Sequence, residues 1–123
     1  MNKKINTLYF SATGTTEKVV CKIARGILKN IGSETMNINN IDFTLPKIRE
    51  QFVSFTGQDI VIVGVPVYAG RVPNVLLEYL NSIKGNGALA VSVVVYGNRN
   101  YDDALIELKD ILELNDFKVI GAG

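Results

Sequence analysis

TLYFSATGTTEKVVCKIARGILKNI, residues 7–31, joins an apolar run, a turn rich in hydroxyl groups and an amphipathic segment. Leu8, Tyr9 and Phe10 are typical of a buried strand, and the turn that follows interrupts it. After Glu17 the apolar residues recur with the spacing of one helical face: Val19, Val20, Ile23, Ala24, Ile27, Leu28 and Ile31. The stretch therefore predicts a strand, a tight turn and a helix that begins at the turn.

The hydroxyl-rich turn comprises Ser11, Ala12, Thr13, Gly14, Thr15 and Thr16. At a helix N-terminus the first backbone N–H groups have no partner within the helix and the helix dipole is positive, so such a turn favours a phosphate group. It lacks the lysine of the triphosphate motif G-x-x-x-x-G-K-[ST] and the second and third glycines of the dinucleotide motif G-x-G-x-x-G. A single phosphate monoester held by N–H and O–H donors fits better. The alternative is that the hydroxyls only cap the helix.

The composition of the 123 residues indicates one globular domain and excludes several kinds of site. The net charge is +1 and the cations are scattered, which argues against nucleic acid as a partner. One cysteine, Cys21, and no histidine exclude a Cys/His zinc site, a cluster held by several thiolates, and Ser-His or Cys-His nucleophilic catalysis. No segment has the pattern of a secretory signal or a membrane span, so we expect a cytoplasmic protein that is not inserted in a membrane.

Strand and helix patterns alternate along the rest of the chain. Thr44 is expected to cap the second helix, with Pro46 in its first turn. The apolar run DIVIVGV at 59–65 suits a strand that is buried on both faces, so we expect an α/β fold with a parallel sheet, right-handed crossovers and helices on both faces. The expected strands are 4–10, 34–41, 59–65, 88–96 and 117–120, and the expected helices are 17–30, 44–55, one from Pro73 to the glycines at 85–87, and one that begins at Asp102 or Asp103.

The loops after the third and fourth strands are the other candidates for a site. In a parallel α/β sheet, ligands bind beyond the carboxyl ends of the strands, where the strand order reverses. Each loop contains a tyrosine, Tyr68 or Tyr101, and two facing tyrosines would hold a flat ring between them. A loop tyrosine can also simply cover the core, and this alternative stays open. The candidate residues are Pro66, Val67, Tyr68, Ala69, Gly70 and Arg71 in the first loop, and Tyr96, Gly97, Asn98, Arg99, Tyr101 and Asp102 in the second.

Three segments carry a resemblance to a known family. Ser11-Ala12-Thr13-Gly14-Thr15-Thr16 resembles the [ST]-x-T-G-x-T phosphate loop of flavodoxins, which binds the phosphate of FMN. The segments VPVYAGRVP and VVVYGNRNYDDAL are similar, more narrowly, to the flavodoxin domain of clostridial ferredoxin–flavodoxin fusion proteins. The resemblance implies a flavodoxin-like doubly wound sheet of five parallel strands in the order 2-1-3-4-5. It also implies that residues 67–71 and 96–101 flank the two faces of the flavin ring.

The same resemblance implies a function. The chain would be an FMN-binding electron-transfer protein that cycles the flavin between its oxidised, semiquinone and hydroquinone forms. Its partners would be redox proteins, with a ferredoxin-type iron–sulfur domain as a candidate. Flavodoxins have a further helix after the fifth strand and this sequence ends before it, so we expect residues 1–123 to be a flavodoxin-like domain truncated before its final helix. Two alternatives stay open: an FMN-dependent NAD(P)H:quinone-type reductase, and a cofactor-free flavodoxin-like interaction module.

Overall fold

The computed structural model describes residues 4–11, 14–31, 38–67, 72–95 and 102–122. Within these residues strands and helices alternate, as the sequence predicts. The elements are, in chain order, β1 (Lys4–Tyr9), α1 (Thr15–Ile31), β2 (Ile38–Asp42), α2 (Pro46–Arg49), β3 (Asp59–Pro66), α3 (Asn74–Ser82), β4 (Leu89–Val95), α4 (Asp102–Leu114) and β5 (Lys118–Ala122).

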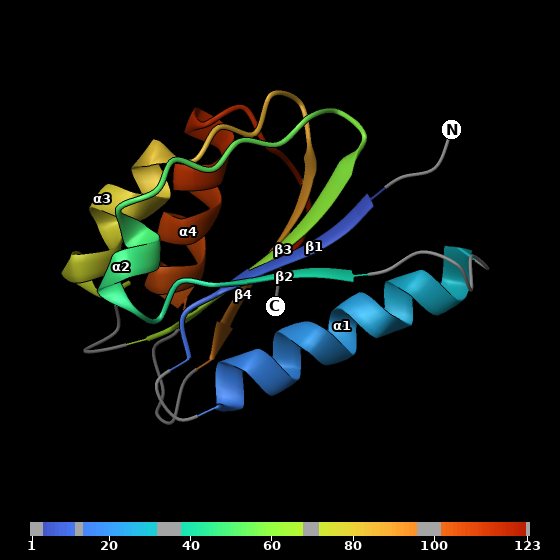
Figure 1. Ribbon diagram of the computed structural model, residues 1–123, viewed down its shortest axis with the longest axis horizontal. Coiled ribbons are helices and arrows are strands. Elements are labelled where there is room, and N and C mark those ends of the chain that lie inside the picture. Colours follow the sequence, from blue (N-terminus) through green and yellow to red (C-terminus); the bar gives the residue numbers. More distant parts are fainter. Residues whose placement is uncertain (1–3, 12–13, 32–37, 68–71, 96–101, 123) are drawn as a thin grey trace.

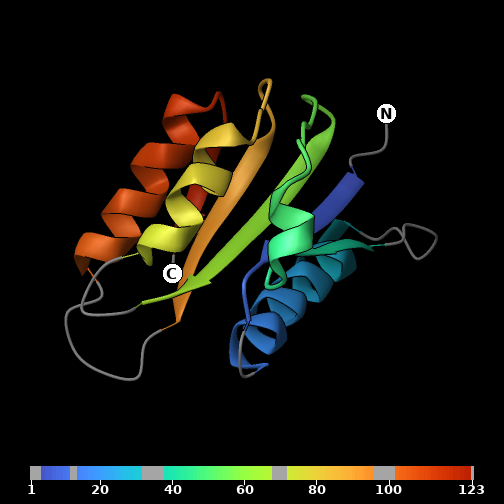
Figure 2. The same cartoon turned by 60° about the vertical axis from the view of Figure 1, so that its left-hand side comes forward.

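The strands of the described residues form one five-stranded sheet in the order β2-β1-β3-β4-β5. Neighbouring strands are parallel throughout this sheet. Figure 1 shows α1 on one face of the sheet and α2, α3 and α4 on the other, and Figure 2 shows the same layers after a turn of the molecule. The predicted fold class, with strand order 2-1-3-4-5 and helices on both faces, is confirmed.

The apolar core is divided by the sheet into two parts. The larger part lies between the sheet and the layer of α2, α3 and α4, and contains Val61, Val63 and Val65 of β3. The smaller part lies beneath α1 and contains Ile60 and Ile62, which alternate with those valines along the strand. β3 is therefore buried on both faces, as the run DIVIVGV predicts.

The α1 face of the sheet is covered unevenly. Of the helices that the structure describes, α1 covers this face (Figure 1), and its Val20 and Ala24 are fully buried. On β4, by contrast, Leu89 and Val91 are only half-buried, and Ile120 of the neighbouring β5 is 55% exposed. The apolar side chains on the β4–β5 side of the sheet are therefore less completely covered than those next to β1.

Gly64 on β3 lets the start of α1 approach the sheet. A Cβ atom at this position would lie 2.3 Å from Cγ2 of Val20 and 3.1 Å from Cγ2 of Thr16. Both of these side chains belong to α1 and are buried, so a larger residue at position 64 would push the first turns of the helix outward. The glycine therefore sets the distance between the helix N-terminus and the sheet.

We expect Gly64→Ala to lower the free energy of unfolding by about 1–3 kcal/mol, because the added methyl group overpacks the contact with α1. The matched control is Gly57→Ala, since a Cβ atom at Gly57 would have no atom within 4 Å. Urea unfolding followed by circular dichroism measures both variants. Equal stabilities of the two variants would contradict the role given to Gly64.

The second helix is shorter than the segment 44–55 that the sequence predicts, and its cap is different. α2 has four residues, and its N-cap is Leu45, which makes no capping side-chain hydrogen bond. The predicted cap, Thr44, instead uses its hydroxyl in hydrogen bonds to Ser11 and Asp42. The expectation of a helix over 44–55 capped by Thr44 is therefore wrong, whereas Pro46 lies in the first turn as predicted.

Residues 53–55 of that predicted helix instead pair with the segment around Lys84. The N–H of Phe55 donates to the carbonyl of Lys84 at 2.8 Å, and the N–H of Lys84 donates to the carbonyl of Val53 at 3.1 Å. The ring of Phe55 also packs on Phe117, with the ring centroids 5.9 Å apart. Pairing with a segment about thirty residues further along the chain thus overrides the local helical preference.

Two further expectations differ in detail. α3 ends at Ser82 rather than at residues 85–87, because Ile83 is extended (φ −75°, ψ 134°). Val19, which the sequence assigns to the apolar stripe of α1, is 36% exposed and lies at the edge of that stripe. Residues 34–37 of the predicted second strand lie outside the described residues.

Tyr79 on α3 is buried without a hydrogen bond to its hydroxyl group. The side chain is 3% exposed, its ring centroid lies 4.7 Å from that of Phe43, and no described residue is a partner for the hydroxyl. Burial raises the pKa of Tyr79 to about 12 from an ordinary value of 10.0. The ring therefore stabilises the core, while the hydroxyl opposes folding because it loses its hydrogen bonds to water.

We expect Tyr79→Phe to raise the free energy of unfolding by about 1 kcal/mol at pH 7, because it removes an unpaired buried hydroxyl. The wild-type protein should also lose stability between pH 10 and about 12, where Tyr79 ionises in the unfolded chain and stays protonated in the folded one. The Tyr79→Phe variant should lose less over the same range. Urea unfolding at pH 7 and pH 11 tests both statements, and a variant that is less stable than wild type at pH 7 would show that the hydroxyl has a partner.

Candidate functional site

The loops that follow β1 and β3 start at adjacent strand ends. Past the end of β1, the N–H of Phe10 donates to the carbonyl of Gly64 at 3.1 Å. Past the end of β3, the N–H of Val67 donates to the carbonyl of Val95, the last residue of β4, at 2.9 Å. The sheet therefore brings the hydroxyl-rich turn and the starts of the two candidate ring loops to one edge, as the sequence predicts.

Within the hydroxyl-rich turn, Gly14 and Ser11 determine how α1 begins. Gly14 has a φ of +87°, a value that favours glycine, and its carbonyl accepts the N–H of Lys18 at 3.1 Å. The Oγ of Ser11 accepts the N–H of Glu17 at 3.1 Å, so Ser11 satisfies one of the first N–H groups of the helix. A hydroxyl can donate while it accepts, so the proton of Ser11 stays available to a ligand.

The turn is held in place by residues that follow β2. The backbone N–H of Ser11 donates to Oγ1 of Thr44 at 2.8 Å. Oδ1 of Asp42 accepts the backbone N–H of Thr44 at 2.9 Å and also accepts the Thr44 hydroxyl. Asp42, Thr44 and Ser11 therefore form a continuous chain of hydrogen bonds that ends at the N-terminus of α1.

Arg49 at the end of α2 reinforces this arrangement. Its Nη1 donates to the carbonyl of Phe43 at 2.9 Å and to the carbonyl of Thr44 at 2.8 Å. The guanidinium carbon also lies 5.7 Å from the ring centroid of Phe10, which follows β1. One cation thus connects the segment after β2 with the segment after β1.

The sequence analysis missed Asp42, Thr44 and Arg49 as supports of the turn. Asp42-Phe43-Thr44 does carry a local signal, because an Asp side chain commonly accepts the N–H of the residue two positions further on. The contact of Thr44 with Ser11 joins residues 33 positions apart, and only the pairing of β1 with β2 brings them together.

Two carboxylates lie close to the turn, and each has a partner within the protein. The pKa of Tyr9 is raised to about 12 by burial, by the charges of Glu17, Asp42 and Cys21, and by a hydrogen bond with Glu17. Asp42 accepts its two hydrogen bonds from Thr44. Repulsion between these carboxylates and a bound anion must be offset by the helix N-terminus and by the hydroxyl donors.

Cys21 on α1 has no sign of a reactive role. Burial and the charge of Glu17 raise the pKa of its thiol, while Arg25 lowers it. The thiol is therefore mostly protonated near neutral pH and is a poor nucleophile. The side chain is half-buried, with its Sγ 3.8 Å from Oδ1 of Asn40.

The described part of the site fits a phosphate group. It presents the Ser11 hydroxyl at the positive end of the α1 dipole, and neither contribution requires a metal ion. Gly14 adds no side chain to the turn, and a Cβ atom there would meet nothing within 4 Å. Among the residues that the structure describes, no group of three or more His, Cys, Asp and Glu side chains could hold a metal.

The candidate ring loops are described only at their ends. Pro66 is the last residue of β3, Val67 is half-buried beside it, and Asp102 is the first residue of α4. The N–H of Val72 donates to Oε1 of Glu107 at 3.0 Å, so the end of the first loop is attached to α4. The remaining predicted site residues lie outside the described residues, and their roles stay predictions: Ala12, Thr13, Tyr68, Ala69, Gly70, Arg71, Tyr96, Gly97, Asn98, Arg99 and Tyr101.

Solved structures share the architecture of this chain. No protein-family model matches the sequence, and no curated protein matches it. A flavoprotein from Lactobacillus acidophilus NCFM, crystallised in complex with FMN, is similar to this chain with a TM-score of 0.64 and 16% sequence identity. The match covers 98% of this chain and 91% of that protein.

Two proteins from Bacteroides, both provisionally described as flavoproteins, have the same arrangement. The one from Bacteroides uniformis ATCC 8492 has a TM-score of 0.54 and 16% identity over 99% of this chain and 90% of its own. The one from Bacteroides eggerthii DSM 20697 has a TM-score of 0.53 and 18% identity over 98% and 87%. These identities are low, so the likeness shows the fold: the chain has a flavodoxin-like α/β fold. No helix in the described residues is both long and apolar enough to cross a membrane.

We expect Thr44→Val to lower the free energy of unfolding by about 1–2 kcal/mol, because the N–H of Ser11 and the carboxylate of Asp42 both lose a partner. Thr44→Ser keeps the hydroxyl and should stay close to wild type. Amide hydrogen exchange at Ser11 gives a local measurement, and it should become faster in Thr44→Val alone. Unchanged exchange at Ser11 would show that Thr44 does not hold the turn.

Proposed function

We propose that this chain is an FMN-binding electron-transfer protein, in which the hydroxyl-rich turn holds the FMN phosphate. The observation that carries the proposal is the turn itself. Its Ser11 caps α1, and its backbone is fixed by Thr44. A turn supported in this way is preorganised to receive a ligand at the helix N-terminus.

The donors of the turn suit a phosphate monoester better than a larger phosphate chain. They comprise hydroxyl groups and N–H groups at a helix start, and the turn sequence contains no lysine or arginine. A hydrogen bond to a charged group is worth ~1.5–3 kcal/mol, so a few of them suffice to anchor one dianion. FMN ends in a single phosphate of this kind, and the similar protein from Lactobacillus acidophilus was crystallised with FMN.

The flavin supplies the redox chemistry when it is bound, and the chain provides binding, orientation and a defined environment. The residues around the candidate ring loops are consistent with that task. Val67 is bonded to β4 and Val72 to α4, so the loop at 68–71 is attached at both ends. Ala104, close to the start of α4, is fully buried, so the chain that follows residues 96–101 is packed against the core. We further propose a redox protein as the partner that exchanges electrons with this chain.

Titration with FMN tests the proposal, and riboflavin, which lacks the phosphate, provides the comparison. Two charge-assisted hydrogen bonds of ~1.5 kcal/mol each make FMN bind about a hundredfold more tightly than riboflavin. Quenching of flavin fluorescence measures both affinities. Failure to bind FMN contradicts the proposal, and equal affinity for the two flavins contradicts the phosphate-binding role of the turn.

Ser11→Ala tests the contribution of the turn to FMN binding independently of the residues expected to contact the flavin ring. The variant should have a lower affinity for FMN and an unchanged affinity for riboflavin, because only the phosphate of FMN would bond to the Ser11 hydroxyl. Ser54→Ala is a matched control, since Ser54 is exposed and lies in the segment that pairs with Lys84. Steady consumption of NADH or NADPH with a quinone by the FMN-loaded protein would instead favour the reductase alternative.

A further inference from the structure

The outer face of α4 carries apolar side chains beyond those that the core uses. Ala104, Leu108 and Leu112 are fully buried and attach the helix to the sheet. Ile106 and Leu114, by contrast, are 56% and 83% exposed. Exposed apolar residues of this size are normal when single, but here they belong to one surface.

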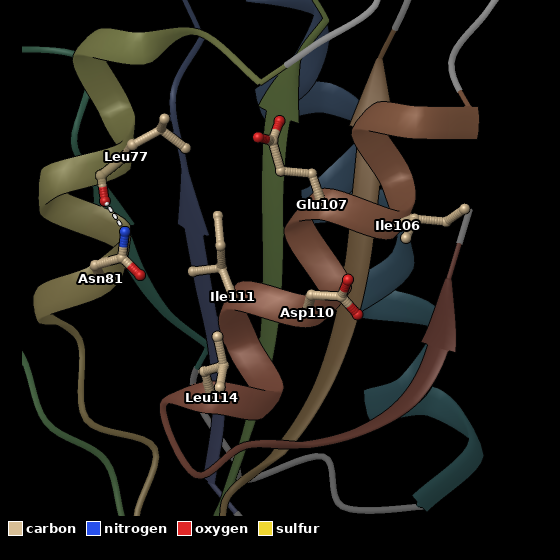
Figure 3. Close-up of a pocket in the computed structure, with 7 residues that line it drawn as sticks. All are labelled: Leu77, Asn81, Ile106, Glu107, Asp110, Ile111 and Leu114. Atoms are coloured by element: carbon tan, nitrogen blue, oxygen red, sulfur yellow. Dashed lines mark hydrogen bonds between the residues drawn. The ribbon is translucent and has the colours of Figure 1, made fainter.

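That surface is a groove of about 550 Å³ formed by α3 and α4 (Figure 3). Ile106, Asp110 and Leu114 are four residues apart and therefore follow one ridge of α4, which is about 12 Å long. Leu77 of α3 and Ile111 of α4 lie between the two helices, as Figure 3 shows. The ridge thus presents an apolar group at each end and a carboxylate in the middle.

The charge of this groove is negative. Glu107 and Asp110 line it, and none of the described residues that line it is a cation. Lys109 is directed to Glu113 on the same helix, 3.7 Å away, and among the described residues Asp110 has neither a hydrogen-bond nor an ion-pair partner. The groove therefore offers an unpaired carboxylate between two apolar contacts.

The opposite face of the molecule has the opposite charge. Lys18, Lys22, Arg25 and Lys29 of α1 are all exposed, and Figure 1 shows α1 across the sheet from α3 and α4. A positively charged partner is consequently repelled by the α1 face and attracted to the α4 face.

We propose that the groove of α3 and α4 is a docking surface for an amphipathic helix of a partner protein, one that carries a lysine or arginine between two large apolar side chains. A helix that lies in a groove contacts it through residues three and four apart, which matches the spacing of Ile106, Asp110 and Leu114. The partner's cation pairs with Asp110, and its apolar groups cover Ile106 and Leu114. The surface is separate from the hydroxyl-rich turn, so the proposal does not depend on FMN binding.

A second copy of this chain does not supply such a helix. α1 is its basic helix, but the apolar residues Val20 and Ala24 of α1 are fully buried against the sheet. The cations of α1 are therefore not flanked by free apolar groups on both sides. α1 of a second copy therefore does not fit the groove, and we take a different protein as the occupant; pairing of two copies through α4, where Lys109 lies between Ile106 and Leu114, is an outcome that the test below distinguishes.

The test uses the whole chain and a fluorescein-labelled synthetic helix of about 18 residues, long enough to span the groove, with a face on which each lysine lies four residues from a leucine on either side. A matched peptide has glutamate in place of each lysine. The lysine peptide should bind about tenfold more tightly or better, as measured by fluorescence anisotropy. Its chemical-shift perturbations in ¹⁵N spectra should be confined to residues 74–82 and 104–114.

Variants of exposed residues localise the binding. Asp110→Lys should weaken binding of the lysine peptide about three- to tenfold, and Leu114→Asn should weaken binding of both peptides. The controls are Glu50→Lys and Leu45→Asn, which change an exposed carboxylate and a 66% exposed leucine away from the groove and should leave binding unchanged. The proposal is overturned by equal affinity for the two peptides, by perturbations centred on α1 or β5, or by self-association of the chain that Asp110→Lys abolishes.

Discussion

The close contact between the N-terminus of α1 and β3 is the constraint on which the rest of the structure depends. Gly64 allows Thr16 and Val20 to lie directly on the strand, which leaves the first turn of the helix beside the carboxyl ends of β1 and β3. A helix N-terminus attracts anions only if its N–H groups face an accessible site, and the position of α1 decides whether they do. The packing of one glycine thus links the stability of the fold to the placement of the proposed phosphate site.

Hydrogen bonds from a neighbouring strand then fix the turn itself. Thr44 follows β2 and holds the backbone of Ser11, while Asp42 fixes Thr44, and Arg49 fixes the carbonyl groups of Phe43 and Thr44. These contacts hold Ser11, the first residue of the turn, before any ligand arrives, so that less entropy is lost on binding. Two carboxylates, Asp42 and Glu17, lie near the proposed anion site. Each has a hydrogen-bond partner within the protein: Thr44 for Asp42 and Tyr9 for Glu17.

The two faces of the molecule differ in charge and in covering, and this difference bears on how the protein meets other molecules. The α1 face is basic, whereas α4 presents Asp110 between the exposed Ile106 and Leu114. α4 begins at the edge of the sheet where the hydroxyl-rich turn lies, because helices in such a fold start beyond the carboxyl ends of the strands. A partner bound along α4 would consequently lie near the proposed flavin site without contacting the turn.

The sequence by itself determined the parallel sheet, the helix predicted at 17–30 and the hydroxyl-rich turn, because these depend on local periodicity and on glycine and hydroxyl residues at fixed spacing; the structure starts that helix two residues earlier, at Thr15. It also located the three loops that are expected to form the site, of which the structure describes Ser11, residues 14–16 and the ends of the other two loops. Only the tertiary structure decided that residues 53–55 are extended, that Thr44 holds Ser11 and that Gly64 determines the position of α1. Each of these contacts joins segments that are far apart in the chain, and the physical reason is that such contacts form through the sheet, whose geometry no local pattern of residues contains.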